Sequence, residues 1–298
     1  MVIPFLNLVA RAVHEHHKDT PESLCVILPN KRGALFLKQY LAKEFGTSLW
    51  LPTIISAEDL VNELSGLTVI EEIDLLCHLY QSYQSVYGQE AESFDSFAKW
   101  GQLMLQDFNE IDRYLADATQ LYTNLKDIKE IENWSLGEEE LSDFQKNYLR
   151  FMNSLGGIYE HYSSFLLSKK WAYQGLAYRQ ALRNLAESDF TNRFQEIWFC
   201  GFNALNKAEL TIIQHLLQKK KAKVLWDADT YYLEDSNQEA GLFLRQNKQF
   251  FNLKEMNHTG SYFKDLKRIR IVSVPKQTGQ AQVVKQRLTD LLNTGVRP

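Results

Sequence analysis

The chain has 298 residues, of which 45% are hydrophobic and 12% aromatic, which is enough apolar material for one large or two medium hydrophobic cores. No window approaches the roughly 18 continuous apolar residues of a membrane helix, and the first residues lack the basic start of a secretory signal, so we expect a cytoplasmic protein without a membrane partner. Cys25, Cys77 and Cys200 lie far apart without CxxC spacing. They predict reduced core thiols, with neither a disulfide framework nor a zinc site.

The small net charge of −4 conceals two regions of opposite sign. Residues 54–144 carry 20 acidic and 4 basic side chains, a net charge of −16, whereas residues 205–298 carry 16 basic and 9 acidic side chains, a net charge of +7. A basic region attracts a polyanion and an acidic region repels it. We therefore expect any nucleic acid to contact the ends of the chain and to avoid its middle.

The first predicted elements are a strand and a helix. Residues 24–29, LCVILP, form a short apolar run, and residues 32–46 follow with apolar side chains at helical spacing. Residues 60–185 are predicted to be almost continuously helical, because apolar side chains recur every three or four residues. The acidic residues between those apolar positions in the middle of the block are Asp95, Asp107, Glu110, Asp112 and Asp117.

Short strands return after this acidic helical block. Apolar runs at residues 195–202 and 221–229 flank a predicted helix at 206–217, and a third run, at 268–274, precedes a helix at 280–292. Alternating strands and helices of this kind predict an α/β domain with a parallel sheet. The chain contains no internal repeat.

The expected domain organisation is one domain split by another. Residues 1–59 and 190–259 are predicted to form the α/β domain, and residues 60–189 a helical insertion. Residues 260–298 are predicted to begin a second α/β domain. Because a helix followed by Gly295 normally leads into a further strand, we expect the sequence to be part of a longer protein.

Two junctions carry a family resemblance. Pro29, Asn30, Lys31, Arg32 and Gly33 follow the first strand, and TIISAEDL, which contains Thr53 and Ser56, comes next. The order of all segments resembles the first motor domain of UvrD-like superfamily 1 helicases. It is most similar to the degenerate version in AddB-type proteins, which carry a PD-(D/E)XK nuclease domain further along the chain. The sharpest local matches are WFCGFNALNKAEL and WDADTYY.

The resemblance implies a RecA-like, P-loop NTPase-like sheet interrupted by a large helical insertion. It also implies that the segment after the first strand contacts single-stranded DNA. The ATP-handling positions, however, are lost. There is no G-x-x-x-x-G-K-[ST] loop, Cys200 stands where the Walker B acid belongs, and the γ-phosphate sensor is replaced by Trp226, Asp227, Ala228, Asp229 and Thr230. We expect no ATP hydrolysis, no catalytic residue in this segment and no cofactor.

The aspartates of WDADTYY allow two other interpretations. A D-x-D pair after a strand holds a metal and a sugar nucleotide in many glycosyltransferases, because hard divalent cations prefer carboxylate oxygens. A structural role has Asp227 capping the turn after the strand, with Tyr231 and Tyr232 packed under the sheet. The structural role is compatible with a place in a former motor motif.

Three other groups of residues have both a structural and a functional interpretation. His14 and His17 share a helix face but lack further metal ligands, which favours a solvated helix end. The stripe of Tyr80, Tyr83 and Tyr87 would stack bases or, more simply, lie in the helical core. A lysine cluster after the helix at 206–217 would cap that helix or contact DNA; its members are Lys219, Lys220, Lys221 and Lys223.

The predicted DNA-binding residues are Asn30, Lys31, Arg32, Thr53 and Ser56. A strand-to-helix junction presents backbone N–H groups, and two cations there suit a backbone phosphate. The expected function is a non-catalytic helicase-like module that binds or guides single-stranded DNA in a helicase-nuclease involved in double-strand-break processing and recombinational repair. One alternative is a scaffold that docks a motor subunit through the acidic block. Another is a metal-dependent glycosyltransferase using Asp227 and Asp229.

Overall fold

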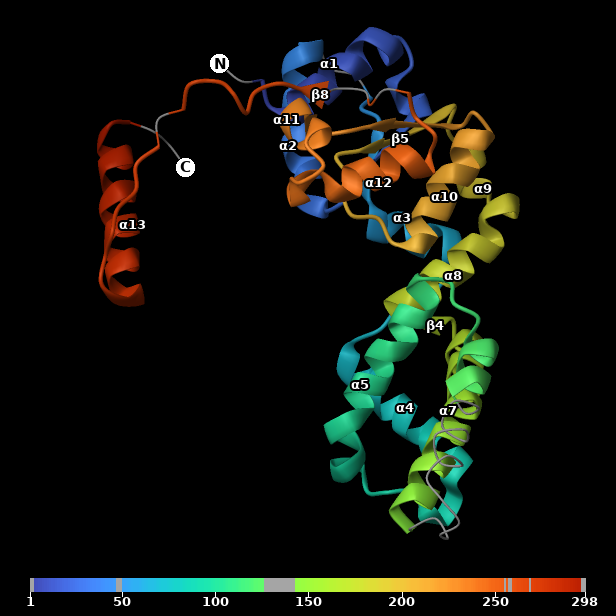
Figure 1. Ribbon diagram of the computed structural model, residues 1–298. Coiled ribbons are helices and arrows are strands. Elements are labelled where there is room, and N and C mark those ends of the chain that lie inside the picture. The colour runs from blue at the N-terminus through green and yellow to red at the C-terminus, as the bar shows by residue number, and fades with distance from the viewer. Residues whose placement is uncertain are drawn as a thin grey trace. The chain divides into compact units, whose positions relative to one another are not determined.

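The computed structural model describes residues 3–46, 50–125, 143–254, 256, 259–267 and 269–295. It divides the chain into two compact units, Met1–Gly260 and Ser261–Pro298, which are treated separately below. The first unit combines a sheet with many helices (Figure 1). Within the described ranges, none of the helices is long and apolar enough to cross a membrane.

A parallel four-stranded sheet forms the centre of the first unit, in the order β2-β1-β5-β6. β1 is paired in register from Cys25 opposite Thr53 to Leu28 opposite Ser56, and β5 pairs along its other side. The chain runs from β1 outward to β2 and later from β5 outward to β6, so the direction of winding changes between β1 and β5. The strand bounds are β1 Leu24–Leu28, β2 Thr53–Ser56, β5 Glu196–Cys200 and β6 Ala222–Leu225.

Both faces of the sheet are covered, because successive side chains of a buried parallel strand point to opposite faces and both sets are apolar. Leu24, Val26 and Leu28 of β1 belong to a cluster with α1 and α2, whereas Cys25 and Ile27 belong to a larger cluster with α3, α8 and α10. The sheet therefore has the doubly wound arrangement of an α/β domain. The helix bounds are α1 Phe5–His17, α2 Lys31–Phe45, α3 Ala57–Ser65, α8 Gln174–Asn184 and α10 Lys207–Gln218.

Most of the sequence between β2 and β5 is helical, as predicted. The long helices are α4 Glu72–Tyr87, α5 Phe94–Arg113 and α7 Asp143–Ser168. The prediction missed a two-residue parallel ladder within this region, in which β3 Thr68–Val69 pairs with β4 Trp171–Ala172. It also misjudged Asp112, which is fully buried although its position between apolar residues resembled that of its exposed acidic neighbours.

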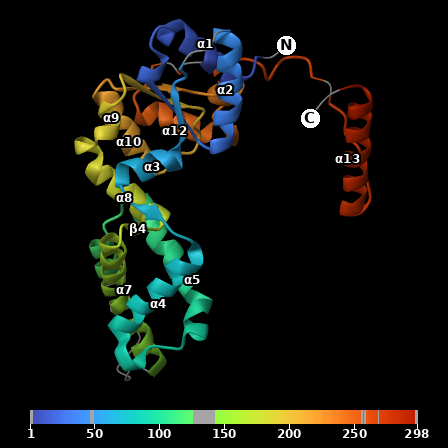
Figure 2. The same ribbon diagram turned by 180° about the vertical axis from the view of Figure 1, so that it is seen from behind.

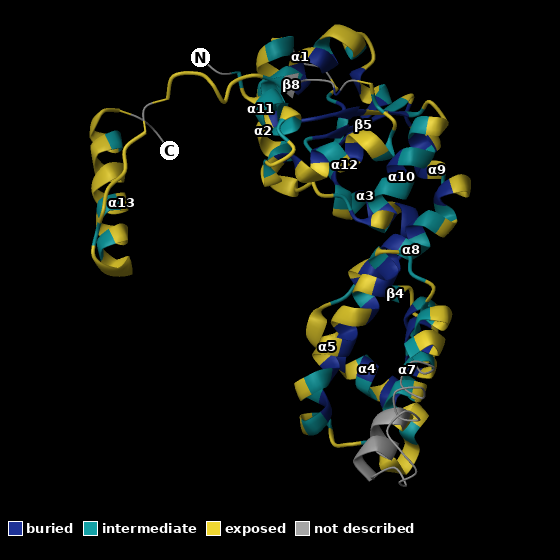
Figure 3. Cartoon of the chain, viewed as in Figure 1, coloured by how far each residue is buried: buried dark blue, intermediate teal, exposed yellow. Residues whose placement is uncertain are grey.

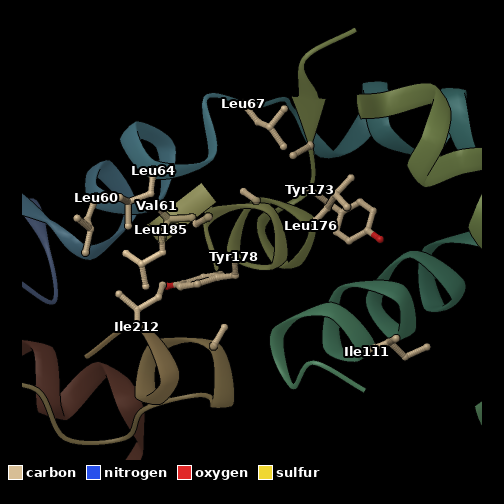
Figure 4. Packing of buried hydrophobic residues seen from close by; sticks show 14 of the residues in the cluster. Leu60, Val61, Leu64, Leu67, Ile111, Tyr173, Leu176, Tyr178, Leu185 and Ile212 are labelled. Carbon is tan, nitrogen blue, oxygen red and sulfur yellow. The ribbon is translucent and has the colours of Figure 1, made fainter. Parts of the chain in front are cut away.

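Helix α8 connects the sheet to the long helices. It lies between the sheet and α4, α5 and α7 in both views of the molecule (Figures 1 and 2). Leu176 and Tyr178 of α8 pack in the same cluster as Val61 of α3 and Ile212 of α10 (Figure 4). This cluster continues into α5 and α7, so the sheet and the helical block share one hydrophobic core.

Buried polar bonds fix the same connection. Asp112, at the end of α5, accepts hydrogen bonds from Tyr159 at 2.6 Å and Tyr173 at 2.5 Å, and it forms an ion pair with Arg179 of α8. Arg179 also donates to the backbone oxygens of Ile111 at 3.0 Å and of Ala116 at 2.7 Å. Helices α5, α7 and α8 thus meet at the Asp112 carboxylate, and both of its oxygens accept hydrogen bonds.

The segment after β6 forms small elements held by a single guanidinium. Arg245 donates to the carbonyl oxygens of Tyr232, Asp235, Ser236 and Gln238 at 2.6–3.2 Å. The elements of this segment are β7 Ala228–Asp229, α11 Thr230–Glu234, α12 Leu242–Phe250 and β8 Thr259–Gly260, which pairs with β7. The short helix α9, Asp189–Asn192, lies earlier in the chain, before β5.

In its described residues, the second unit contains one helix, α13 Lys276–Asn293. The strand predicted at 268–274 is wrong for the described residues 269–274, which have no regular secondary structure. A strand requires a neighbouring backbone for its hydrogen bonds, and no partner pairs with this apolar run in the described part of the chain. Accordingly, Ile269 and Ile271 are exposed, and most of α13 is coloured as exposed in Figure 3, in contrast to the buried strands of the sheet.

Candidate nucleic-acid interface

The carboxyl ends of the four parallel strands lie along one edge of the sheet. In doubly wound domains, ligands bind outside this edge where the direction of winding changes, which here is between β1 and β5. The segments that follow these two strands begin at Pro29 and Gly201. The residues that flank them are therefore the first candidates for a binding site.

The predicted junction after β1 has the expected local structure. Asn30 is the N-cap of α2, and its Oδ1 accepts a hydrogen bond from the Gly33 N–H at 3.0 Å. Lys31 and Arg32 are the first two residues of the helix and are exposed. Arg32 forms no ion pair with any other described residue, which leaves its guanidinium available to a phosphate.

Lys31 is neutralised within the chain. Its Nζ lies 3.2 Å from Asp59 Oδ1 and 3.7 Å from Glu58 Oε2, both in the first turn of α3. The hydrogen bond to Asp59 and the attraction of the two carboxylates raise the pKa of Lys31. Partial burial opposes ionisation of Asp59, but hydrogen bonds from Ser56 and Lys31 outweigh it and hold the pKa of Asp59 below its ordinary value. A phosphate would have to compete with these acids for Lys31.

The structure does not bring the two predicted residues of β2 into the interface. Ser56 is buried and caps α3: its Oγ accepts from the Asp59 N–H at 3.1 Å and donates to Asp59 Oδ2 at 2.7 Å. Thr53 is the first residue of β2 and lies opposite Cys25, at the amino edge of the sheet. Only Asn30, Lys31 and Arg32 of the five predicted residues are therefore at the accessible strand-end site.

Lys207 was not among the residues predicted from the sequence. Asn206 caps α10 after β5, in a capping box with Glu209, and Lys207 is the first, exposed residue of that helix. The adjacent strands β1 and β5 thus each lead into a helix with an asparagine cap and a lysine at its first position. A cation at a helix N-terminus is disfavoured by the helix dipole, and the sequence places such a cation at Lys207 as it does at Lys31.

Apolar groups lie at the carboxyl end of β5. Gly201, directly after β5, has a positive φ of 74°, and a Cβ there would lie 3.2 Å from the ring of Phe5 in α1. Cys200 is fully buried, as predicted, and burial raises the pKa of its thiol. An aromatic ring and a neutral thiol, neither of which binds phosphate or magnesium, thus lie at the carboxyl end of β5.

Cys77 corrects the prediction that all three cysteines are core thiols. Cys25 and Cys200 are buried, but Cys77 lies exposed on α4. Burial also raises the pKa of Cys25 to about 12, so its reactive thiolate is scarce at neutral pH.

We expect one thiol per native chain to react quickly with an aromatic disulfide reagent at pH 8, and all three to react after unfolding in guanidinium. The released chromophore measures both counts. A Cys77→Ser variant is expected to show no fast reaction in the native state. Fast modification of a second thiol in that variant would contradict the buried positions of Cys25 and Cys200.

The aspartates after β6 have mainly structural surroundings. Asp229, and not Asp227 as predicted, caps the next turn: its Oδ1 accepts from the Tyr231 N–H at 3.0 Å, and Thr230 begins α11. Tyr231 and Tyr232 are half-buried on α11 and pack edge to face. Partial desolvation raises the pKa of Asp227. Among all described residues, no group of three or more His, Cys, Asp or Glu side chains is placed to hold a metal ion, so the geometry gives the glycosyltransferase alternative no support.

The lysine cluster lies at the opposite edge of the sheet. Residues 219–221 immediately precede β6, whereas Lys31 and Lys207 follow strands. Lys223 is paired with Glu196 at 3.0 Å, and His17 lies 3.1 Å from the same carboxylate, so His17 is not the solvated residue that the sequence suggested. Partial burial would raise the pKa of Glu196, but hydrogen bonds, foremost from Trp198 and Lys223, hold it below its ordinary value.

The tyrosine stripe belongs to the helical block. Tyr83 is buried and packs against Tyr87 with ring centroids 4.5 Å apart, and Tyr80 contacts Phe97. This is the core position that the sequence favoured over base stacking.

No protein-family model matches the chain, and no curated protein matches it significantly. Its function must therefore be argued from the fold and from the charges at the strand ends.

Proposed function

We propose that this chain is a non-catalytic, RecA-like helicase module of an AddB-type helicase-nuclease, and that it guides single-stranded DNA during the processing of broken DNA ends for recombinational repair. A cytoplasmic location and a helicase-nuclease partner subunit are parts of the proposal. The observation that carries it is the arrangement at the switch point. Two neighbouring strands lead into capped helices whose first turns present Arg32 and Lys207 to solvent.

Two further features support the proposal. The UvrD-like segments of the sequence follow strands of one parallel sheet, and a long helical stretch lies between β2 and β5, where the resemblance expects an insertion. At the same edge, the Phe5 ring and the buried Cys200 thiol lie beside the end of β5, and neither group can hold a phosphate or a magnesium ion. The order of the segments on the sheet and the groups at the end of β5 are both consistent with a domain that holds DNA without hydrolysing ATP.

The test is fluorescence anisotropy of a labelled single-stranded oligonucleotide titrated with the whole chain at several salt concentrations. The variant is Arg32→Glu with Lys207→Glu. Glutamate is favoured in the first turn of a helix, so this variant is expected to fold. Losing two phosphate contacts should weaken binding by about tenfold or more at low salt and reduce the slope of log K against log salt by about 1.4.

The matched control reverses two lysines at the opposite edge, Lys219→Glu with Lys220→Glu. It changes the net charge equally but should bind DNA nearly as the parent does. Equal loss in both variants would mean that only total charge matters. No binding of the parent chain at low salt would contradict the proposal altogether.

A further inference from the structure

A large cavity lies in the helical block, away from the strand ends. Its volume is about 1,130 Å³, and residues of α4, α5 and α7 line it. Pockets for ligands commonly occur between the helices of bundles, where apolar side chains form the walls. The volume exceeds that of an isolated packing defect, which in a native core is seldom larger than a water molecule.

The floor of the cavity is apolar and aromatic. Met104 and Phe108 of α5, Tyr83 of α4 and Tyr122 are buried there. At the rim, Leu103 keeps 62% of its surface exposed although it is a large apolar side chain. An exposed leucine beside an aromatic floor is typical of a docking groove.

Carboxylates surround this floor. Glu90 is paired with Arg150, and Glu110 with Arg113 at 3.1 Å, but Asp107 has no cationic partner among the described residues. Partial desolvation raises the pKa of Asp107, which is the direction expected for a carboxylate without a compensating charge. The lining contains four carboxylates and one arginine, so the rim favours a cationic occupant.

We propose that this cavity docks an amphipathic, lysine- or arginine-rich helix of a partner protein. Such a helix places apolar side chains at every third or fourth position on the aromatic floor and cations beside Asp107 and Glu110. Charge complementarity would speed encounter and exclude acidic helices. The inference does not depend on DNA binding, because the two sites lie on different elements and each can be disabled alone.

The test uses a synthetic 18-residue helical peptide with leucine or phenylalanine at every third or fourth position and lysine between, and a second peptide with glutamate for lysine. Each labelled peptide is titrated with the whole chain and followed by anisotropy. We expect the lysine peptide to bind and the glutamate peptide to bind at least about tenfold more weakly. Asp107→Asn with Glu110→Gln should weaken the lysine peptide about five- to tenfold, since each partly exposed pair contributes modestly.

The matched control, Glu71→Gln with Asp74→Asn, removes two exposed carboxylates at the start of α4, the N-cap and one in the first turn, both outside the cavity lining, and should leave binding unchanged. Equal weakening in both variants would overturn the proposal, as would equal binding of the two peptides or no binding of either. Dimers in sedimentation velocity that the peptide dissociates would identify a second copy as the occupant. Leu121 lines the cavity, so a Leu121→Cys variant in a Cys77→Ser background reports whether the cavity is open to a reagent. Slow labelling of this cysteine by a neutral maleimide would show that the chain itself fills the cavity, which also overturns the proposal.

Discussion

Replacement of Asp112 by alanine is expected to lower the free energy of unfolding by about 3–5 kcal/mol. The substitution leaves the Arg179 guanidinium partly buried without its carboxylate and removes the acceptor of the Tyr159 and Tyr173 hydroxyls. Burial holds Tyr173 in its neutral form, with its pKa raised well above the ordinary value, so this hydroxyl cannot compensate by ionising. The loss should be measured by urea denaturation followed by circular dichroism.

The control for this prediction is Glu63→Ala. Glu63 also pairs with an arginine, Arg193, at 2.8 Å, but both side chains are more than half exposed. Exposed pairs contribute at most about 1 kcal/mol. If the Glu63 and Asp112 variants lose similar stability, the buried network does not hold the three helices together.

Adding one methyl group at Gly175 is expected to destabilise the chain by about 1–3 kcal/mol or more. A Cβ on Gly175, near the start of α8, would lie 2.2 Å from the backbone oxygen of Asn109 in α5. The Gly175 N–H also donates to Asn109 Oδ1 at 2.7 Å, so the two helices cannot separate without losing this bond. Thermal and urea unfolding of Gly175→Ala measure the effect.

Gly157 gives a matched substitution of opposite sign. It lies inside α7, and a Cβ there would meet no atom within 4 Å. Alanine in a helix interior is favoured over glycine by about 0.5–1 kcal/mol, so Gly157→Ala should stabilise the chain. Destabilisation by both substitutions would mean that the close approach of α5 and α8 is not the cause at Gly175.

Local sequence patterns were sufficient for most elements because their apolar periodicity reflects burial in the fold. Strand β1 and all of β5 after Glu196 are continuous apolar runs, as expected of strands covered on both faces, whereas the edge strand β6 includes the exposed Lys223. The edge strand β2 was not predicted as a strand, since four residues, TIIS, are too few to show a period. The opposite error at 269–274 arose because strand propensity does not ensure a neighbour with which to pair.

The candidate sites depended more strongly on tertiary contacts. The junction after the first strand was predicted from the local pattern, and in the structure Asn30 caps the helix that follows it. The neutralisation of Lys31 was not predictable, because it follows from the pairing of β1 with β2, which brings Asp59 beside the start of α2. Likewise, no local pattern distinguished Asp112, which is buried, from Asp107, which lines the cavity.

The continuous core around α8 limits how this protein can be divided into fragments for expression. A cut between residues 59 and 60 would split α3 and separate the Ser56–Asp59 capping box from Leu60, Val61 and Leu64. Each fragment would expose the apolar face that the other covers, and both should be recovered mainly as aggregates. Coexpression of the two halves, which allows the faces to meet during folding, is the arrangement expected to yield soluble material.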